Sequence, residues 1–269
     1  MRAELELARE LARAAGGAVL AHYGTTTSQA KVGGSPVTAA DHAANAVITA
    51  GLRRRFPDDA ILSEESGDDR SRLGAERLWI VDPLDGTKEF LAQNGEFSIM
   101  IGLVVGGEPV LGVVYLPAGD LLFSASRGEG AWIDRNGTRE RLLRAPAIPS
   151  SLRLVGSRSH SEPMLVRIQD ALGITDVELC GSVGVKCSRI ADGRRDLYVH
   201  PVPYLKEWDT CAPEIILTEA GGHVSDCLGE PLRYNKPDPG QPAGIVACAP
   251  GCADVVLDTV RPVYQEGRR

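Results

Sequence analysis

The sequence predicts a mixed α/β fold that is built from two halves. Two amphipathic helical segments come first, a series of apolar runs joined by glycine-rich turns begins at residue 97, and strand and helix patterns alternate after residue 151. Apolar runs joined by tight turns favour an antiparallel meander, whereas alternating strands and helices favour an α/β unit. We therefore expect a large antiparallel sheet in the first half and an α/β second half.

The chain begins with a segment that is typical of an amphipathic helix. Leu11, Ala15 and Val19 recur with a helical period, and Gly24 is expected to cap the C-terminus of the helix. The polar, glycine-rich segment 25–36 that follows is expected to be a loop.

A second helix is predicted over residues 39–56, and Thr38 can act as its N-cap. Its apolar face is expected to consist of Ala43, Val47 and Ala50. Two short apolar runs come next, over 60–63 and 77–82, and each runs into acidic residues.

The meander is predicted from apolar runs that are separated by turn sequences. The runs cover residues 98–105, 109–116, 120–126 and 130–135. Asn136-Gly137 matches a glycosylation acceptor when read with Thr138, but Asn-Gly after a strand favours a hairpin turn.

The proline-containing segment 145–151 is the expected boundary between the halves. We predict an N-terminal α+β half over residues 1–148 and a C-terminal α/β half over residues 149–269.

Composition and charge exclude several classes of protein. The 36 acidic residues outnumber the 29 Lys and Arg residues and give a net charge of −7, which argues against a nucleic-acid or anionic-membrane binder. The sequence contains no run of about 18 apolar residues, so it predicts no membrane-spanning helix. The charged N-terminal helix does not fit a signal peptide, so we expect a cytoplasmic protein. The six cysteines form no CxxC motif and are expected to be free, buried thiols.

Three acidic clusters indicate a functional site. They lie at 63–66, 82–87 and 207–214, and the first two directly follow short apolar runs. Burying unpaired carboxylates in an apolar core costs free energy, so these acids cannot all face the core. One or two acids after apolar runs would be ordinary helix N-caps. Three separate clusters favour a common site instead.

The sequence DPLDGT, residues 82–87, is the most informative of these clusters. Pro83 turns the chain after a strand, so Asp82 and Asp85 can converge on one point. Gly86 permits close backbone approach, and Thr87 offers a hydroxyl at an expected helix start, where backbone amides favour phosphate. Carboxylates beside a phosphate require a bridging cation, and Mg²⁺ prefers oxygen ligands.

The chain resembles the inositol monophosphatase superfamily, a group of Mg²⁺-dependent, lithium-sensitive phosphatases. The resemblance rests on WIVDPLDGTKEF at 79–90, SEES at 63–66 and EWDTCAPE at 207–214, in this order along nearly the whole chain. DGTKEF, together with SRSHS at 157–161 and LRYNK at 232–236, is most similar to the 3'(2'),5'-bisphosphate nucleotidase (CysQ) branch. The resemblance implies a layered αβαβα sugar-phosphatase fold with the site between the halves.

The resemblance also implies metal ligands. Glu64, Asp82 and the carbonyl of Leu84 would hold one Mg²⁺ ion, and Asp82, Asp85 and Asp209 would hold a second. A third, weakly held metal would depend on the loop that contains Lys31, Gly33 and Gly34, which otherwise reads as a plain surface loop.

Two residues would activate the attacking water according to the same resemblance. Thr87, paired with Asp41, would position and deprotonate it. Read from the sequence alone, Asp41 could equally serve the N-terminus of its own helix.

The implied substrate contacts come from both halves. They are Glu64, Leu84, Asp85, Gly86, Thr87, Ser157, His160, Ser182, Lys186 and Asp209. Lys186 and Arg158 are cations that could meet a second phosphate, although Lys186 and His160 also fit an ordinary surface lysine and a loop histidine. Residues 198–205 carry no acid, whereas inositol phosphatases use a glutamate there to bind inositol hydroxyls.

We therefore expect a phosphomonoesterase that converts adenosine 3',5'-bisphosphate, a by-product of sulfur assimilation, to AMP and phosphate. The alternative within the family is an inositol- or fructose-type sugar monophosphatase. A non-catalytic phosphonucleotide sensor is the alternative outside enzymes, but a sensor would have no need of the pair Asp41 and Thr87. Turnover with Mg²⁺ separates these classes. The sequence does not determine the oligomeric state, and a homodimer is one of the options.

Overall fold

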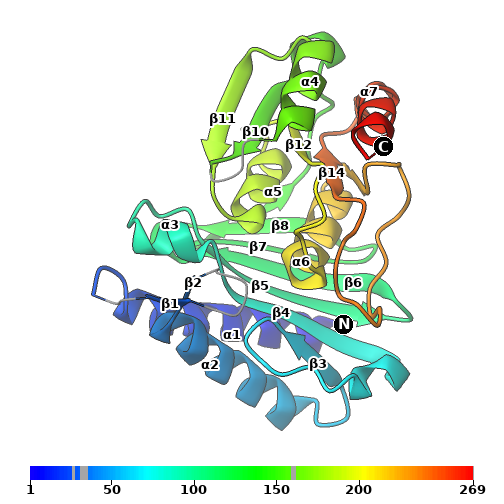
Figure 1. Ribbon diagram of the computed structural model, residues 1–269. Coiled ribbons are helices and arrows are strands. Elements are labelled where there is room, and N and C mark those ends of the chain that lie inside the picture. Colours follow the sequence, from blue (N-terminus) through cyan, green and yellow to red (C-terminus); the bar gives the residue numbers. More distant parts are fainter. Residues whose placement is uncertain (26–27, 31–35, 159–161, 269) are drawn as a thin grey trace.

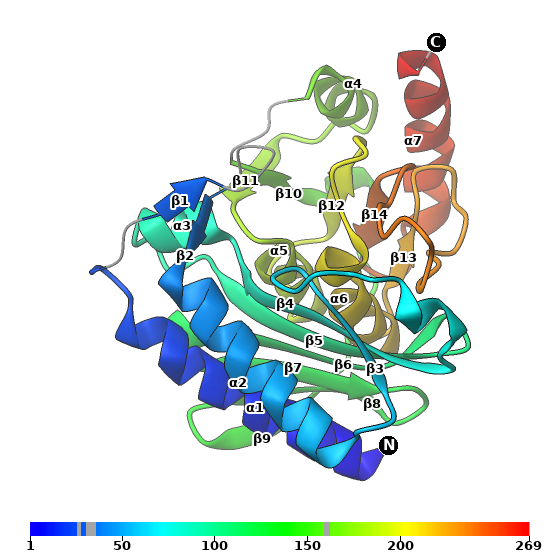
Figure 2. The ribbon, with the colours of Figure 1, turned by 60° about the horizontal axis from the view of Figure 1, so that its bottom comes forward.

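The computed structural model describes residues 1–25, 28–30, 36–158 and 162–268, with the backbone alone for 28–30. The described elements stack as alternating helical and sheet layers, which confirms the expected αβαβα arrangement (Figure 1). Helices α1 and α2 lie on one side of a seven-stranded sheet, α5 and α6 lie between the two sheets, and α4 and α7 lie beyond the five-stranded sheet (Figures 1 and 2).

Helices α1 (Arg2–Ala21) and α2 (Ala39–Arg55) form the first layer. Helix α1 buries Leu11, Ala15 and Val19 as predicted, but its C-cap is His22, so the assignment of the cap to Gly24 is wrong. The caps differ because the chain stays right-handed at position 22 and reaches positive φ only two residues later.

The predicted face of α2 is also wrong. Thr38 caps the helix as expected, but the buried stripe contains Ala44, Ile48 and Leu52, and Ala50 is exposed. The alanine-rich sequence permits two neighbouring stripes, and the sheet selects the one with the larger Ile and Leu side chains. The segment 25–36 is not entirely a loop, because β1 (Ser28–Ala30) pairs with β2 (Pro36–Thr38).

The seven-stranded sheet confirms the meander. Its strands, in spatial order, are β3 (Ala60–Ser63), β4 (Arg77–Asp85), β5 (Ser98–Val105), β6 (Glu108–Leu116), β7 (Leu121–Ser126), β8 (Gly130–Arg135) and β9 (Thr138–Leu142). All neighbours are antiparallel except β3 and β4, which are parallel. Asn136 and Gly137 both have positive φ, at 51° and 74°, and form the predicted hairpin turn between β8 and β9.

The five-stranded sheet confirms the strand and helix alternation in the second half. Its spatial order is β11 (Asp176–Cys180), β10 (Arg153–Ser157), β12 (Leu197–His200), β14 (Ile245–Cys248) and β13 (His223–Ser225). The pairs of β10 are parallel, and those of β14 are antiparallel. The helices are α4 (Pro163–Ala171), α5 (Val183–Ala191), α6 (Glu207–Glu219) and α7 (Ala253–Gly267), of which α7 was not predicted.

Alternate residues of β4 face different layers. Leu78 and Ile80 belong to the apolar cluster that includes α5, α6 and the second sheet, whereas Trp79 and Val81 pack with α1 and α2. The first of these clusters contains residues from both predicted halves. The division at 145–151 therefore stays a prediction, although this segment does connect the two sheets.

Helix α6 packs unusually close to the large sheet because two glycines are paired beneath it. Gly102 on β5 lies opposite Gly112 on β6. A Cβ atom added to Gly102 would lie 2.5 Å from Sγ of Cys211, and one added to Gly112 would lie 2.6 Å from the backbone oxygen of Ala212. The missing side chains thus set the position of α6, and with it the position of Asp209.

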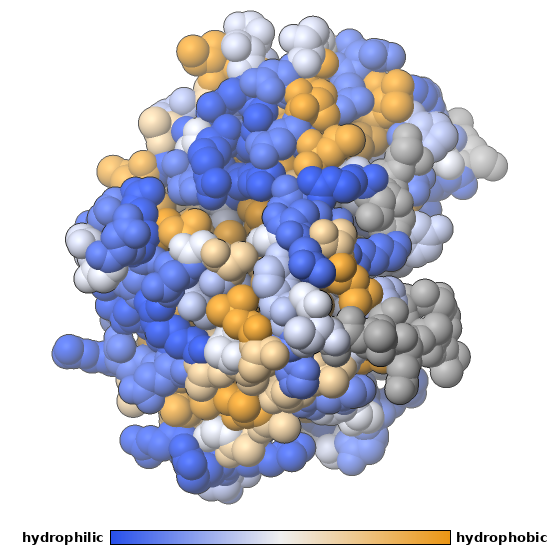
Figure 3. Space-filling view, turned by 90° about the vertical axis from the view of Figure 1, so that its left-hand side faces the viewer, coloured by the Kyte–Doolittle hydropathy of each residue, from blue (hydrophilic) through white to orange (hydrophobic). Residues whose placement is uncertain are grey.

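The cysteines and the surface are those expected from the sequence analysis. The six cysteines are free and buried, as predicted. Among the described residues, no helix is long and apolar enough to cross a membrane. The side of the molecule that carries α3 (Thr87–Leu91) and β11 shows mainly hydrophilic residues, with hydrophobic ones in separate groups (Figure 3).

Candidate active site

The three acidic clusters meet at one edge of the large sheet. Because β3 and β4 are parallel and Ser63 pairs with Val81, Glu64 directly after β3 lies beside Asp82 on β4. Helix α6 brings Asp209 to this edge from the second half. Carboxylate oxygens of Asp82, Asp85 and Asp209 lie within 4.8 Å of one another. All four acids line one cavity of about 300 Å³.

Hydrogen bonds hold the three aspartates in place. Asp82 Oδ1 accepts a hydrogen bond from the amide of Leu84 at 3.0 Å, across the strand irregularity that Pro83 introduces. Asp209 Oδ2 accepts from the amide of Lys206 at 2.6 Å, at the start of α6. Asp85 Oδ2 accepts from Ser182 and from the amide of Gly184.

These contacts leave each aspartate able to bind a cation. Among the described residues, the hydrogen bonds to Asp82, Asp85 and Asp209 each occupy one carboxylate oxygen. Burial, and then the charges of Glu64, Asp85 and Asp209, raise the pKa of Asp82 well above its ordinary value. Burial and neighbouring carboxylates raise the pKa of Asp209 in the same way. A buried group of like charges suits a hard cation with oxygen ligands.

The predicted pair Thr87 and Asp41 is in contact. Thr87 Oγ1 lies 3.2 Å from Asp41 Oδ1, to which it can donate, and 3.3 Å from the carbonyl of Leu84. The other oxygen of Asp41 accepts from the amide and the hydroxyl of Thr38, each at 2.7 Å. Asp41 therefore completes a capping box for α2 and also faces Thr87, so both readings of this residue hold structurally.

Gly86 and Ser182 shape the cavity through unusual backbone conformations. Gly86 has φ of 93°, and a Cβ there would lie 2.9 Å from the backbone oxygen of Glu96. Ser182 has φ of 43°, which is rare for a residue with a side chain. Its hydroxyl lies 2.5 Å from Asp85 Oδ2. The same hydroxyl accepts a hydrogen bond from the amide of Val185, so Ser182 is the N-cap of α5. Ser182 thus positions a predicted metal ligand.

Lys186 lies deep in the cavity wall. Its side chain is 3% exposed, and Nζ donates to the carbonyl of Ser182 at 3.3 Å. The ammonium group also lies 5.2 Å from the ring centre of Tyr198. Burial lowers the pKa of Lys186. A surface lysine is therefore the wrong description, and Lys186 is a buried cation that faces the site.

The remaining predicted contacts differ in outcome. Ser157 lines the cavity. His160, Lys31, Gly33 and Gly34 lie outside the described residues. Arg158 lies next to the site, but its guanidinium already donates to Glu96 at 2.5 Å and to the carbonyl of Leu179 at 3.0 Å.

The prediction missed several residues of the cavity wall. They are Pro36, Lys88, Glu89, Gly181, Val183, Tyr198, His200, Tyr204 and Leu205. Glu89 lies in the motif that carries the family resemblance, and Tyr198 to Leu205 form the segment without an inositol-binding acid. The aromatic and histidine content of that segment was the available signal.

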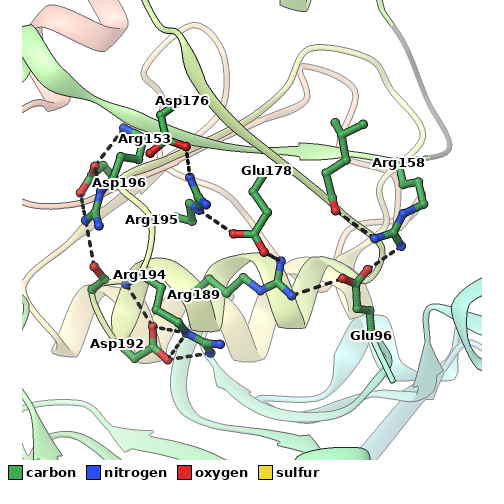
Figure 4. A network of polar contacts seen from close by, with 12 residues as sticks. Glu96, Arg153, Arg158, Asp176, Glu178, Arg189, Asp192, Arg194, Arg195 and Asp196 are labelled. Carbon is green, nitrogen blue, oxygen red and sulfur yellow. Dashed lines mark hydrogen bonds and ion pairs between the residues drawn. The ribbon is translucent and has the colours of Figure 1, made fainter. Parts of the chain in front are cut away.

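A polar network joins the two halves beside the cavity (Figure 4). Glu96 precedes β5 and accepts from Arg158, from Arg189 of α5 and from the amide of Gly181. Arg189 continues the network to Glu178 on β11. Burial alone would raise the pKa of Glu96, but the hydrogen bonds and the charges of the two arginines outweigh it and lower the pKa to about 2.

The chain is similar to known proteins along most of its length. The model of the inositol monophosphatase family matches residues 1–260. The 3'(2'),5'-bisphosphate nucleotidase CysQ of Escherichia coli K12 is 41% identical over 229 residues, which cover 84% of this chain and 91% of that protein. The 3'-phosphoadenosine 5'-phosphate phosphatase of Mycobacterium leprae is 37% identical over 237 residues, with 84% and 83% covered.

Two solved structures are similar along almost the whole chain. CysQ from Bacteroides thetaiotaomicron has a TM-score of 0.79 and 36% identity, and the match covers 92% of this chain and 98% of that one. The Thermotoga maritima IMPase has a TM-score of 0.83 and 28% identity, with 98% of each chain covered.

Proposed function

Because the chain belongs to the inositol monophosphatase family, we propose that its site hydrolyses the 3'-phosphate of adenosine 3',5'-bisphosphate to give AMP and phosphate. The names and the identity of the bisphosphate nucleotidase relatives support this substrate class. The observation that carries the proposal is the convergence of Asp82, Asp85 and Asp209 within 4.8 Å, beside the contact between Thr87 and Asp41.

The carboxylates fit magnesium. Glu64, Asp82 and the carbonyl of Leu84 would hold one ion, and Asp82, Asp85 and Asp209 would hold a second. Bound Mg²⁺ supplies a water of lowered pKa and stabilises negative charge on the leaving oxygen. The donor set supports this assignment because it offers oxygen atoms alone and concentrates negative charge that a cation would neutralise.

The protein residues would orient the water and the phosphate. Thr87 can accept a hydrogen bond from water while its own proton points toward Asp41, so a proton can pass from water to Thr87 and on to Asp41. The amides of Gly86 and Thr87 would bind the scissile phosphate at the start of α3. Ser182 and Gly184 fix Asp85, which keeps the ligand set in place during turnover.

The second half of the chain offers groups for a nucleotide. Lys186 is a buried cation that suits a second phosphate, and Ser157 and His160 are expected to assist it. Tyr204 lines the cavity and is 65% exposed. Its accessible ring therefore offers a surface on which a base can stack. Residues 198–205 carry no acid that would repel phosphate there.

A phosphate-release panel tests the substrate class. We expect kcat/KM to be highest for adenosine 3',5'-bisphosphate among that compound, phosphoadenylyl sulfate, inositol phosphate and fructose bisphosphate. Lys186→Met removes the charge and keeps an unbranched side chain that is one heavy atom shorter. It should reduce kcat/KM for the adenosine bisphosphate roughly ten- to hundredfold more than for a simple monophosphate. Equal losses, or a preference for inositol or fructose phosphate, would favour the sugar-phosphatase alternative.

A further inference from the structure

The cavity wall contains a buried carboxylate that the proposed metal and water sites do not use. Glu89 is the third residue of α3, is 6% exposed and lines the cavity. Within the described part of the chain, its side chain takes part in no hydrogen bond, and its ion pair is with Arg158, at 3.6 Å between Nη1 and Oε1. The same Arg158 nitrogen donates to Glu96 at 2.5 Å. The acceptor capacity of Glu89 is therefore largely unfilled.

The position of Glu89 places it next to the reacting centre. A Cβ atom on Gly181 would lie 2.1 Å from Cδ of Glu89 and 2.6 Å from its Oε1, so the carboxylate packs directly against this glycine. The next residue is Ser182, whose hydroxyl lies 2.5 Å from Asp85. Glu89 thus lies against the same Gly181–Ser182 segment that holds a proposed metal ligand.

The chemistry of Glu89 restricts what can bind beside it. The carboxylate oxygens of Glu89 are accessible from the cavity, so they can accept a hydrogen bond from a ligand. An ionised carboxylate accepts hydrogen bonds and repels phosphate. The fitting group is therefore an uncharged hydroxyl that neighbours the scissile phosphate. In a nucleoside 3'-phosphate, that group is the 2'-hydroxyl.

We propose that Glu89 accepts a hydrogen bond from the 2'-hydroxyl of the substrate and makes the enzyme select ribonucleotides over 2'-deoxyribonucleotides. This inference rests on the proposed function, because it presumes a nucleotide in the cavity. It assigns Glu89 a role in specificity and none in the chemical step.

The test compares adenosine 3',5'-bisphosphate with its 2'-deoxy analogue. The wild-type protein should show a kcat/KM roughly ten- to hundredfold higher for the ribonucleotide, as expected for a hydrogen bond to a charged group. In Glu89→Leu the preference should vanish. Glu89→Gln has nearly the same shape and keeps one acceptor, so it should retain a smaller preference and carries the test if the leucine variant does not fold.

Glu96→Gln is the matched control. Glu96 binds the same Arg158 but does not line the cavity, so its substitution should leave the ribonucleotide preference unchanged. Equal wild-type rates for both substrates, a preference that persists in Glu89→Leu, or one that is undiminished in Glu89→Gln would overturn the role of Glu89 and leave the nucleotidase activity standing. If the wild type releases phosphate from neither substrate, the proposed function fails and this inference with it.

Discussion

Replacing Gly112 by alanine should loosen the metal site from a distance. The added Cβ would lie 2.6 Å from the carbonyl oxygen of Ala212 and 2.5 Å from Cγ2 of Ile215. A backbone oxygen cannot rotate away as a side chain can, so α6 must move outward by roughly half an ångström to restore normal contact distances. Asp209 is the third residue of α6 and moves with it.

The expected effect of Gly112→Ala has two parts. Overpacking of a core contact costs about 1–3 kcal/mol of unfolding free energy, and each kcal/mol lowers Tm by roughly 2–4 °C in a chain of this size. Metal ligands tolerate deviations of only about 0.2 Å, so the affinity for Mg²⁺ should also fall. Thermal unfolding across a magnesium titration measures both quantities.

Gly156→Ala is the matched control for that experiment. Gly156 also lies in a strand, but its added Cβ would meet the end of the exposed Leu179 side chain at 3.3 Å, and this side chain can move. The control should keep the wild-type Tm and magnesium midpoint. The reasoning is refuted if Gly112→Ala does the same.

Three further predictions concern charge and proton transfer. Asp209→Asn should keep the fold but reduce kcat by far more than tenfold, and a smaller loss, below about 1.4 kcal/mol in the barrier, would remove Asp209 from the metal ligands. Thr87→Ala and Asp41→Asn should each slow turnover, and the double variant should be little slower than the worse single one; multiplicative losses would show independent action. The pKa of Glu96 is about 2 in the folded protein against an ordinary 4.5, so its stabilisation is present above pH 4.5 and is lost as the pH falls toward 2. Because its partner Arg158 is 40% exposed, solvent screening limits the effect to about 1 kcal/mol. Glu96→Gln should lose that amount of unfolding free energy at pH 7 and show a flatter acid unfolding profile, which chemical denaturation at several pH values can disprove.

Local sequence patterns predicted the parts of the fold that local physics determines. The meander and the turn at Asn136-Gly137 were predictable because alternation and positive φ are properties of neighbouring residues. Helix α7 escaped prediction, and its internal Pro262 obscures the periodicity. The face of α2 was wrong because its alanine-rich sequence does not distinguish two stripes, and only the packed sheet decides between them.

The candidate site was predictable to the extent that its groups are close in the sequence. The turn after Asp82 brings Asp85 near it through local geometry. The contact between Asp41 and Thr87 was implied by the family resemblance and could not be derived from spacing. The burial of Lys186 and the position of Glu89 against Gly181 depend on how the two sheets meet, which no single segment encodes.

The most direct test removes and restores magnesium while the product is identified. The protein is treated with a chelator, dialysed and given adenosine 3',5'-bisphosphate, and the nucleotide formed is separated by chromatography before and after Mg²⁺ is added. The account predicts no phosphate release without the metal, recovery with it, and adenosine 5'-monophosphate as the nucleotide product. Release that persists in chelator, or formation of adenosine 3'-monophosphate, would contradict it.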